Sequence, residues 1–275
     1  MLNRRKAGFW FSVILLLGSV IRAEALVQVE PSLVELDDRN RTASIKVTNA
    51  GSVSENFRVY LSFSDMDETG ELVEKRPGDE DPSAIDFIRF MPRSMSLDPG
   101  EHQLVRLRAR MPEGLEEGEY RAHIYFQNVP EAPEISESEE EDGFSTTISF
   151  STRVGVPIMI TRGSPPFTAG IDDISLSPGR EPKVIFNISA DKRTLRGVVA
   201  AALVCPESGE TVKASAEDFL VVYSGARVRH TLALDELDEG LEVYRGWDLR
   251  ITYNRYDRDE EGVGGLLAEE YIKVK

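Results

Sequence analysis

An alternation of apolar and polar residues with a period of two is the feature that most restricts how this chain of 275 residues can fold. Segments 43–48, 57–63, 105–110 and 120–127 follow it, and turns rich in Asn, Asp, Pro and Gly separate them. Successive side chains of a strand point to opposite faces of a sheet, so this pattern predicts half-buried strands. No long segment has helical periodicity, and we predict an all-β protein.

The predicted strands fall into two sets. The first set lies between residues 26 and 160, and a stretch rich in Gly, Ser and Pro follows at 162–166. About seven antiparallel strands in roughly 100 residues are typical of an immunoglobulin-like sandwich. We therefore predict two immunoglobulin-like antiparallel β-sandwich domains, at 26–160 and 161–275. The strands of the second set are predicted at 184–188, 198–204, 220–223, 228–234, 249–253 and 271–274.

Residues 1–25 have the pattern of a secretory signal peptide. A basic cluster at 4–6 precedes an apolar run of 13 residues at 9–21, and Ala23-Glu24-Ala25 matches the small-x-small pattern of a cleavage site. The run is shorter than the roughly 20 residues that span a bilayer, although an N-terminal membrane anchor is the alternative interpretation. We predict cleavage after Ala25, export, and no stable membrane insertion afterwards.

Composition excludes several classes of function. The formal net charge is −16, and it changes to −19 when residues 1–25 are removed, because four basic residues and one acidic residue leave with them. Proteins that bind nucleic acid through its phosphates need clustered basic residues, so we predict no nucleic-acid partner. The lone Cys205 cannot form an internal disulfide and is predicted to be a small core residue of a buried strand.

No catalytic or metal-binding motif is present. His102, His123 and His230 lie far apart in sequence, without the spacing of metal ligands. The chain also lacks a nucleophile elbow, a zinc-protease motif and a phosphate-binding loop. We predict no catalytic residue, no metal, no cofactor and no enzymatic activity, and we expect His123 to be an exposed imidazole on the polar face of its strand.

Three acidic segments are interpreted as turns or loops. Segments 65–70 and 257–262 resemble the start of an EF-hand, but Arg76 and Ala268 stand where the bidentate Glu belongs, so we predict hairpin turns. Residues 131–143 hold seven acidic residues and no basic one. Such a segment cannot bury apolar area, and we predict a solvated loop at the rim of the first sandwich.

Residues 116–122 have the spacing of a tyrosine corner. In that motif a Tyr at the start of a strand donates a hydrogen bond back across the preceding turn. Tyr120 opens a cleanly alternating strand and is the predicted donor, with an ordinary turn and a core Tyr as the alternative.

Together these motifs resemble the PapD-like periplasmic pilus chaperones. The resemblance is strongest between residues 90 and 130 and covers about 135 residues well. It implies a boomerang arrangement of the two domains and a periplasmic location. It also implies pilin-like subunits and an outer-membrane usher as partners, and a free chain that is a monomer. The motifs that carry it are Phe90-Met91-Pro92-Arg93, Leu97-Asp98-Pro99-Gly100, Gln103-Leu104-Val105-Arg106, Gly118-Glu119-Tyr120-Arg121 and Asn128-Val129-Pro130.

Members of this family lend an edge strand to a subunit that lacks its own final strand. The strand needs large apolar side chains at alternate positions, which fill pockets of the subunit while main-chain hydrogen bonds give affinity. A packing role inside the chain's own sandwich is the alternative for the same residues. The candidate donor residues are Ile148, Phe150, Thr152, Val154 and Val156, with Thr152 as the weak point of the row.

The chain departs from the family at the carboxylate clamp. Family members hold the subunit's terminal carboxylate with an Arg and a Lys, and this alignment places Leu33 and Gly155 at those two positions. Arg153 is a substitute anchor, although its side chain is predicted on the opposite face of the strand from the apolar row. Two functions are therefore compatible with the sequence: a chaperone of pilin-like subunits, or an exported two-sandwich binding or structural protein that keeps the fold alone.

Overall fold

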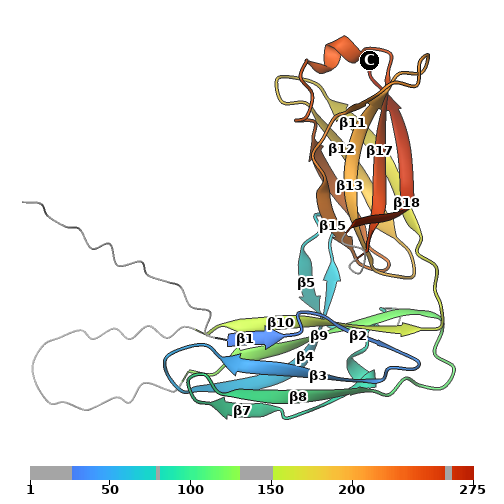
Figure 1. Cartoon of the computed structure of the whole chain (residues 1–275). Coiled ribbons are helices and arrows are strands. Elements are labelled where there is room, and N and C mark those ends of the chain that lie inside the picture. The colour runs from blue at the N-terminus through green and yellow to red at the C-terminus, as the bar shows by residue number, and fades with distance from the viewer. Residues whose placement is uncertain (1–26, 79–80, 131–150, 258–261) are drawn as a thin grey trace, which may run out of the picture.

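A computed structural model describes residues 27–78, 81–130, 151–257 and 262–275. It contains two β-sandwiches in a bent arrangement, with one end of the second sandwich standing over the first (Figure 1). The predicted all-β class with two sandwich domains is confirmed. The helical segments that the model describes are two short 3-10 turns, η1 (Ile85–Phe87) and η2 (Leu241–Tyr244). No helix in the described ranges is long and apolar enough to cross a membrane.

The N-terminal sandwich is built from strands β1 to β10. One sheet has the order β1-β3-β8-β6, and the other has the order β2-β10-β9-β4, with β5 and β7 pairing beyond β4. Every pair is antiparallel except β2 and β10, which run parallel. The strands are β1 (Val27–Glu30), β2 (Val34–Asp37), β3 (Thr42–Asn49), β4 (Glu55–Met66), β5 (Leu72–Lys75), β6 (Ile88–Met91), β7 (Ser94–Leu97), β8 (His102–Ala109), β9 (Gly118–Asn128) and β10 (Arg153–Arg162).

At two of the places where the chain crosses from one sheet of this domain to the other, the connection contains a proline. Strand β1 pairs with β3, and after Pro31 the chain continues as β2, which pairs with β10 in the opposite sheet. Strand β6 pairs with β8, and after Pro92 the chain continues as β7, which pairs with β4. Proline has no N–H to give to a ladder, so it suits a position where pairing stops.

The C-terminal sandwich is built from strands β11 to β18. Its smaller sheet has the order β11-β12-β16, and its larger sheet has the order β14-β13-β17-β18, with β15 pairing along β13. The strands are β11 (Ala169–Ser177), β12 (Lys183–Ala190), β13 (Leu195–Val204), β14 (Thr211–Lys213), β15 (Asp218–Val222), β16 (Arg227–Ala233), β17 (Asp248–Asp257) and β18 (Gly262–Lys273).

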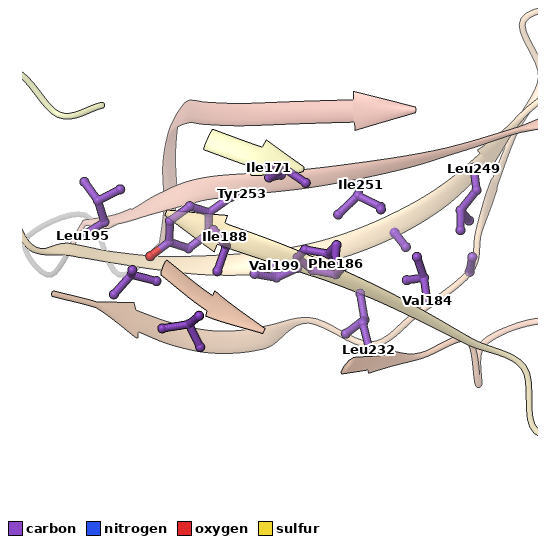
Figure 2. Packing of buried hydrophobic residues seen from close by; sticks show 14 of the residues in the cluster. Ile171, Val184, Phe186, Ile188, Leu195, Val199, Leu232, Leu249, Ile251 and Tyr253 are labelled. Atoms are coloured by element: carbon purple, nitrogen blue, oxygen red, sulfur yellow. The ribbon is translucent and has the colours of Figure 1, made fainter. Parts of the chain in front are cut away.

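Each sandwich has its own apolar core. Ile45, Val105, Ile124, Phe126 and Ile158 are fully buried in the N-terminal core. In the C-terminal core, side chains from β12, β13, β16 and β17 interdigitate between the sheets (Figure 2). Burying one large aliphatic or aromatic side chain contributes roughly 1.5–3 kcal/mol. The alternation noted in the sequence is therefore the pattern of these two cores.

Two local predictions are confirmed and one is wrong. The Tyr120 hydroxyl donates to the main-chain carbonyl of Glu116 at 3.1 Å, which is the bond of a tyrosine corner. Segment 65–70 forms the turn between β4 and β5, with Met66 paired to Leu72. Cys205 is not a core residue of a strand: β13 ends at Val204, and Cys205 is half-buried in the following turn, where its N–H pairs with the Glu210 carbonyl.

A glycine in β13 provides a test of the C-terminal packing. A Cβ on Gly197 would lie 2.4 Å from the Asn254 carbonyl oxygen and 2.5 Å from the Tyr253 ring, so Gly197→Ala forces β13 and β17 apart. We expect the free energy of unfolding to fall by about 1–3 kcal/mol, measured by chemical denaturation. Gly265→Ala is the matched control, because a Cβ there meets open space. Equal stability of the two variants would contradict the close contact.

Candidate functional site

Strand β10 is paired along its whole length on one side but only along half of the other. Its Arg153–Arg162 residues all pair with β9, whereas β2 pairs only with residues 158–161. The Asn128 N–H donates to the Thr152 carbonyl, so Thr152 and the residues that alternate with it direct their backbone groups toward β9. The backbone groups of Arg153, Gly155 and Pro157 therefore point away from β9. Pro157 lies where the pairing with β2 begins, and beside Arg153 and Gly155 no described strand pairs.

The predicted donor residues do not all share one environment. Val156 is 1% exposed and belongs to the N-terminal core, and Val154 is half-buried against the same core. Thr152 is exposed, and its N–H donates to the Asn128 side chain. Ile148 and Phe150 lie outside the described residues. Among the described residues of this row, Val156 therefore packs into this chain's own sandwich, whereas Thr152 is accessible.

The two clamp positions are used for packing. Leu33 is partly buried against the core of the C-terminal domain. A Cβ on Gly155 would lie 2.6 Å from the Tyr125 ring, so the glycine lets that ring lie directly over β10. Neither position offers a charged group, which agrees with the departure seen in the sequence.

Arg153 lies on the face of the sheet, and its guanidinium is already engaged. It donates to the Glu74 carboxylate at 2.9 Å and to the Tyr60 hydroxyl at 3.3 Å, and it lies 4.6 Å from the centre of the Tyr125 ring. The Ser62 hydroxyl also donates to Glu74, and together with Arg153 it lowers the pKa of that carboxyl. A subunit carboxylate that used Arg153 as an anchor would have to compete with Glu74.

The same face of the sheet is joined to the C-terminal domain by Arg121 of β9. This side chain is 1% exposed, and its guanidinium donates to both the carbonyl and the hydroxyl of Ser224, at 2.9 and 3.0 Å. It also pairs with Asp65 and lies 5.2 Å from the ring centre of Tyr223. A buried charge is tolerated only when it is paired and hydrogen-bonded, so these contacts hold the two domains together.

Glu119 of β9 and the turn between β4 and β5 extend this interface. Glu119 accepts hydrogen bonds from both the N–H and the hydroxyl of Thr194, and burial raises its pKa against the effect of those bonds. Near the β4–β5 turn, the Arg229 N–H donates to the Glu68 carbonyl at 2.7 Å. Figure 1 shows the β4–β5 hairpin reaching from the first sandwich to the second.

The prediction that His123 is exposed is wrong. Its parity does place it on the polar face of β9, but the C-terminal domain covers that face, and His123 is 3% exposed. Its Nε2 lies 3.3 Å from the Tyr223 hydroxyl, and its Nδ1 has no partner among the described residues. Burial, with the nearby Arg121 charge second, lowers the pKa of His123 to about 4.

Removing the Arg121 charge tests the interface. We expect Arg121→Leu to lower the free energy of unfolding by about 1–3 kcal/mol, because the Ser224 carbonyl loses its donor while Asp65 keeps Lys75 as a partner. The control is Arg227→Leu, which breaks an exposed pair with Asp172 and should change stability little. Chemical denaturation measures the free energy of unfolding of both variants. An equally small effect of the two substitutions would show that Arg121 does not hold the two domains together.

Acid should weaken the fold through His123. The folded-state pKa is about 4 and the unfolded value is 6.5, so the unfolded chain binds more protons between these values. The contribution of His123 to the free energy of unfolding is then complete above pH 6.5. It declines as pH falls toward 4, by up to about 3 kcal/mol. In His123→Asn we expect the free energy of unfolding to depend less steeply on pH in this window, by the equivalent of about one bound proton. An unchanged slope would place the titration elsewhere.

Comparisons with known proteins find similar solved structures but no similar sequence. No protein-family model matches the chain, and no curated protein matches it in sequence. A chain of the CsuC–CsuE chaperone–tip adhesion subunit complex of Acinetobacter baumannii is 12% identical over 90% of this chain and 98% of its own, with a TM-score of 0.47. A chain of the CFA/I chaperone–tip adhesin complex is 13% identical over 85% and 93%, with a TM-score of 0.48.

A third solved structure, the class 5 fimbriae chaperone CfaA, is 12% identical over 89% of this chain and 98% of its own, with a TM-score of 0.45. At such identities and with TM-scores below 0.5, function has to be argued from the residues of this chain. The descriptions of these three structures each name a chaperone of pili or fimbriae.

Proposed function

We propose that this chain is an exported periplasmic chaperone that binds incomplete β-sandwich subunits, of the pilin kind, by offering them the open half of β10. The free chain would be a monomer, and the subunit would be passed to an outer-membrane usher for fibre assembly. The observation that carries the proposal is the one-sided pairing of β10 before Ile158.

The open side of β10 has the groups that strand addition requires. Arg153 and Gly155 each direct an N–H and a carbonyl outward. A subunit strand that paired here would continue the sheet from the point where β2 stops, so its backbone would be satisfied without displacing any strand of this chain.

The apolar contacts of such a complex would come from the residues before β10. Val156 is committed to this chain's core, so the large side chains available to a subunit groove are Ile148 and Phe150, with Val154 at the boundary. These residues share one parity, and alternate side chains of one strand fill successive pockets of a partner.

A second candidate function is an exported two-sandwich binding or structural protein without subunit capture. It is favoured by the loss of the clamp, since Leu33 packs against the second domain and Gly155 lies under Tyr125. Family members rely on two cations at these positions, whereas this chain has only Arg153, which is paired with Glu74.

One substitution at the open edge of β10 distinguishes the two functions. Arg153→Pro removes the side chain and the outward N–H, whereas the control Arg153→Ala removes the side chain only. Each variant would be co-expressed with a strand-deficient pilin-type subunit, and co-purification would be measured. We expect Arg153→Pro to capture at least roughly tenfold less subunit than Arg153→Ala, at equal thermal stability.

Phe150→Asp supplies a second test. A carboxylate cannot enter an apolar groove without a large desolvation cost, so capture should be lost while the chain alone stays folded. Capture that survives Phe150→Asp and Arg153→Pro, or a wild-type chain that captures no subunit, would overturn the chaperone function and leave the second candidate.

A further inference from the structure

Three arginines lie together on the outer face of the four-stranded sheet. Arg106 and Arg108 are exposed on β8, and Arg89 on β6 is paired directly opposite Arg108. Like charges directly opposite each other destabilise a sheet. Arg89 donates only to main-chain carbonyls. In the ranges that the structure describes, none of the three forms an ion pair with a carboxylate.

This arrangement is unusual for a chain of net charge −16. Other surface arginines, such as Arg153, Arg162 and Arg227, do have carboxylate partners. The sheet face around Arg106 instead presents uncharged neighbours, because Ser44 and Met91 stand opposite it on the two adjoining strands. The local positive charge is therefore not neutralised by the residues around it, and it suits an anionic ligand.

The arginines line a groove of about 1370 Å³ between β3, β6, β7 and β8. We call it the arginine groove and define it by Arg89, Met91, Ser94, Leu104, Arg106 and Arg108. Met91 and Leu104 are 76% and 43% exposed, so the groove presents apolar contacts between its charges. Such a mixture fits a ligand that carries both carboxylates and apolar groups.

The groove also contains an open strand edge. Strand β6 pairs with β8 only at residues 106–109, because the chain leaves this sheet after Met91. The Asn49 N–H donates to the Glu101 carbonyl, so by alternation Leu104 and His102 direct their backbone groups away from β3. The Leu104 carbonyl accepts the Gln103 side-chain amide at 3.4 Å, and no described strand pairs there.

We propose that the arginine groove binds an acidic segment of a partner polypeptide, which adds to β8 as a short strand at residues 102–105. The outward backbone groups of His102 and Leu104 would pair with the segment, and its carboxylates would lie against Arg106, Arg108 and Arg89. Alternate apolar side chains of the segment would contact Met91 and Leu104. The open ladder favours a polypeptide over an anionic lipid surface, because only a backbone matches its donor and acceptor spacing.

The probe for this site is a fluorescein-labelled, end-capped peptide of about twelve alternating glutamates and valines. Binding to the full chain would be followed by fluorescence anisotropy. We expect saturable binding that weakens when the salt is raised from about 20 mM to about 300 mM. The same peptide N-methylated at alternate residues keeps its charge but loses backbone donors, and it should bind at least roughly tenfold more weakly.

Variants of the chain locate the binding. Arg106→Glu with Arg108→Glu reverses two exposed charges and should weaken binding at least roughly tenfold. Arg180→Glu, an exposed reversal in the C-terminal domain, is the matched control and should change binding little. Leu104→Pro removes the outward N–H together with the side chain, and Leu104→Ala removes the side chain only, so binding should fall further with proline at equal thermal stability.

Three outcomes would overturn the proposal as a whole, and a fourth would overturn its mode of binding. One is the absence of binding, and another is an equal effect of the Arg180 and Arg106/Arg108 reversals. The third is binding that occurs only after residues 131–143 are replaced by a neutral linker, because the occupant would then be this chain's own acidic segment. Equal binding of the N-methylated and ordinary peptides would remove strand addition as the mode. Capture of pilin-type subunits is a separate measurement and does not depend on this site.

Discussion

The buried guanidinium of Arg121 is the contact on which the arrangement of the two sandwiches depends. It lies between Asp65 of the first domain and Ser224 of the second, and it has aromatic rings on two sides. A charge removed from water in this way is stable only while its partners stay in place. Movement of one domain against the other would break several hydrogen bonds at once and leave a buried charge unpaired. The interface therefore acts as a rigid joint rather than as a hinge.

A rigid joint determines which surfaces of the first sandwich remain for function. The face of the β9 and β10 sheet nearest the joint is occupied by His123, Tyr223 and Glu119, all of which serve the interface. Farther along the same face, Arg153 is paired with Glu74. What the domain still offers are its strand edges and the outer face of its other sheet, and the two binding modes proposed above use these surfaces.

Much of the fold follows from local patterns, whereas the joint does not. Alternation identified strands such as β3, β8 and β9 because each has one face in a core, whereas β5 is exposed along its whole length. The tyrosine corner was found because its donor and acceptor are only four residues apart. His123 was misplaced for the opposite reason: its polar-face parity is correct, but burial comes from Tyr223, a hundred residues away. A periodicity of two reports which face a residue lies on, and it cannot report that a second domain covers that face. Cys205 shows a second limit, since its apolar run continues one residue past the end of the strand.

Both open edges have the same origin in the chain's topology. At Pro31 the chain leaves the β3 sheet for β10, and because β2 begins to pair only at Ile158, the first half of β10 has one partner. At Pro92 the chain leaves β8 for β4, and the first half of β8 is left with β3 alone. An exposed edge invites uncontrolled pairing, so natural sheets keep such edges short and place charges beside them. Each edge here spans only a few residues, and each has arginines next to it. The same charges that discourage random association also select which strand can pair, and for the edge of β8 they favour an acidic one.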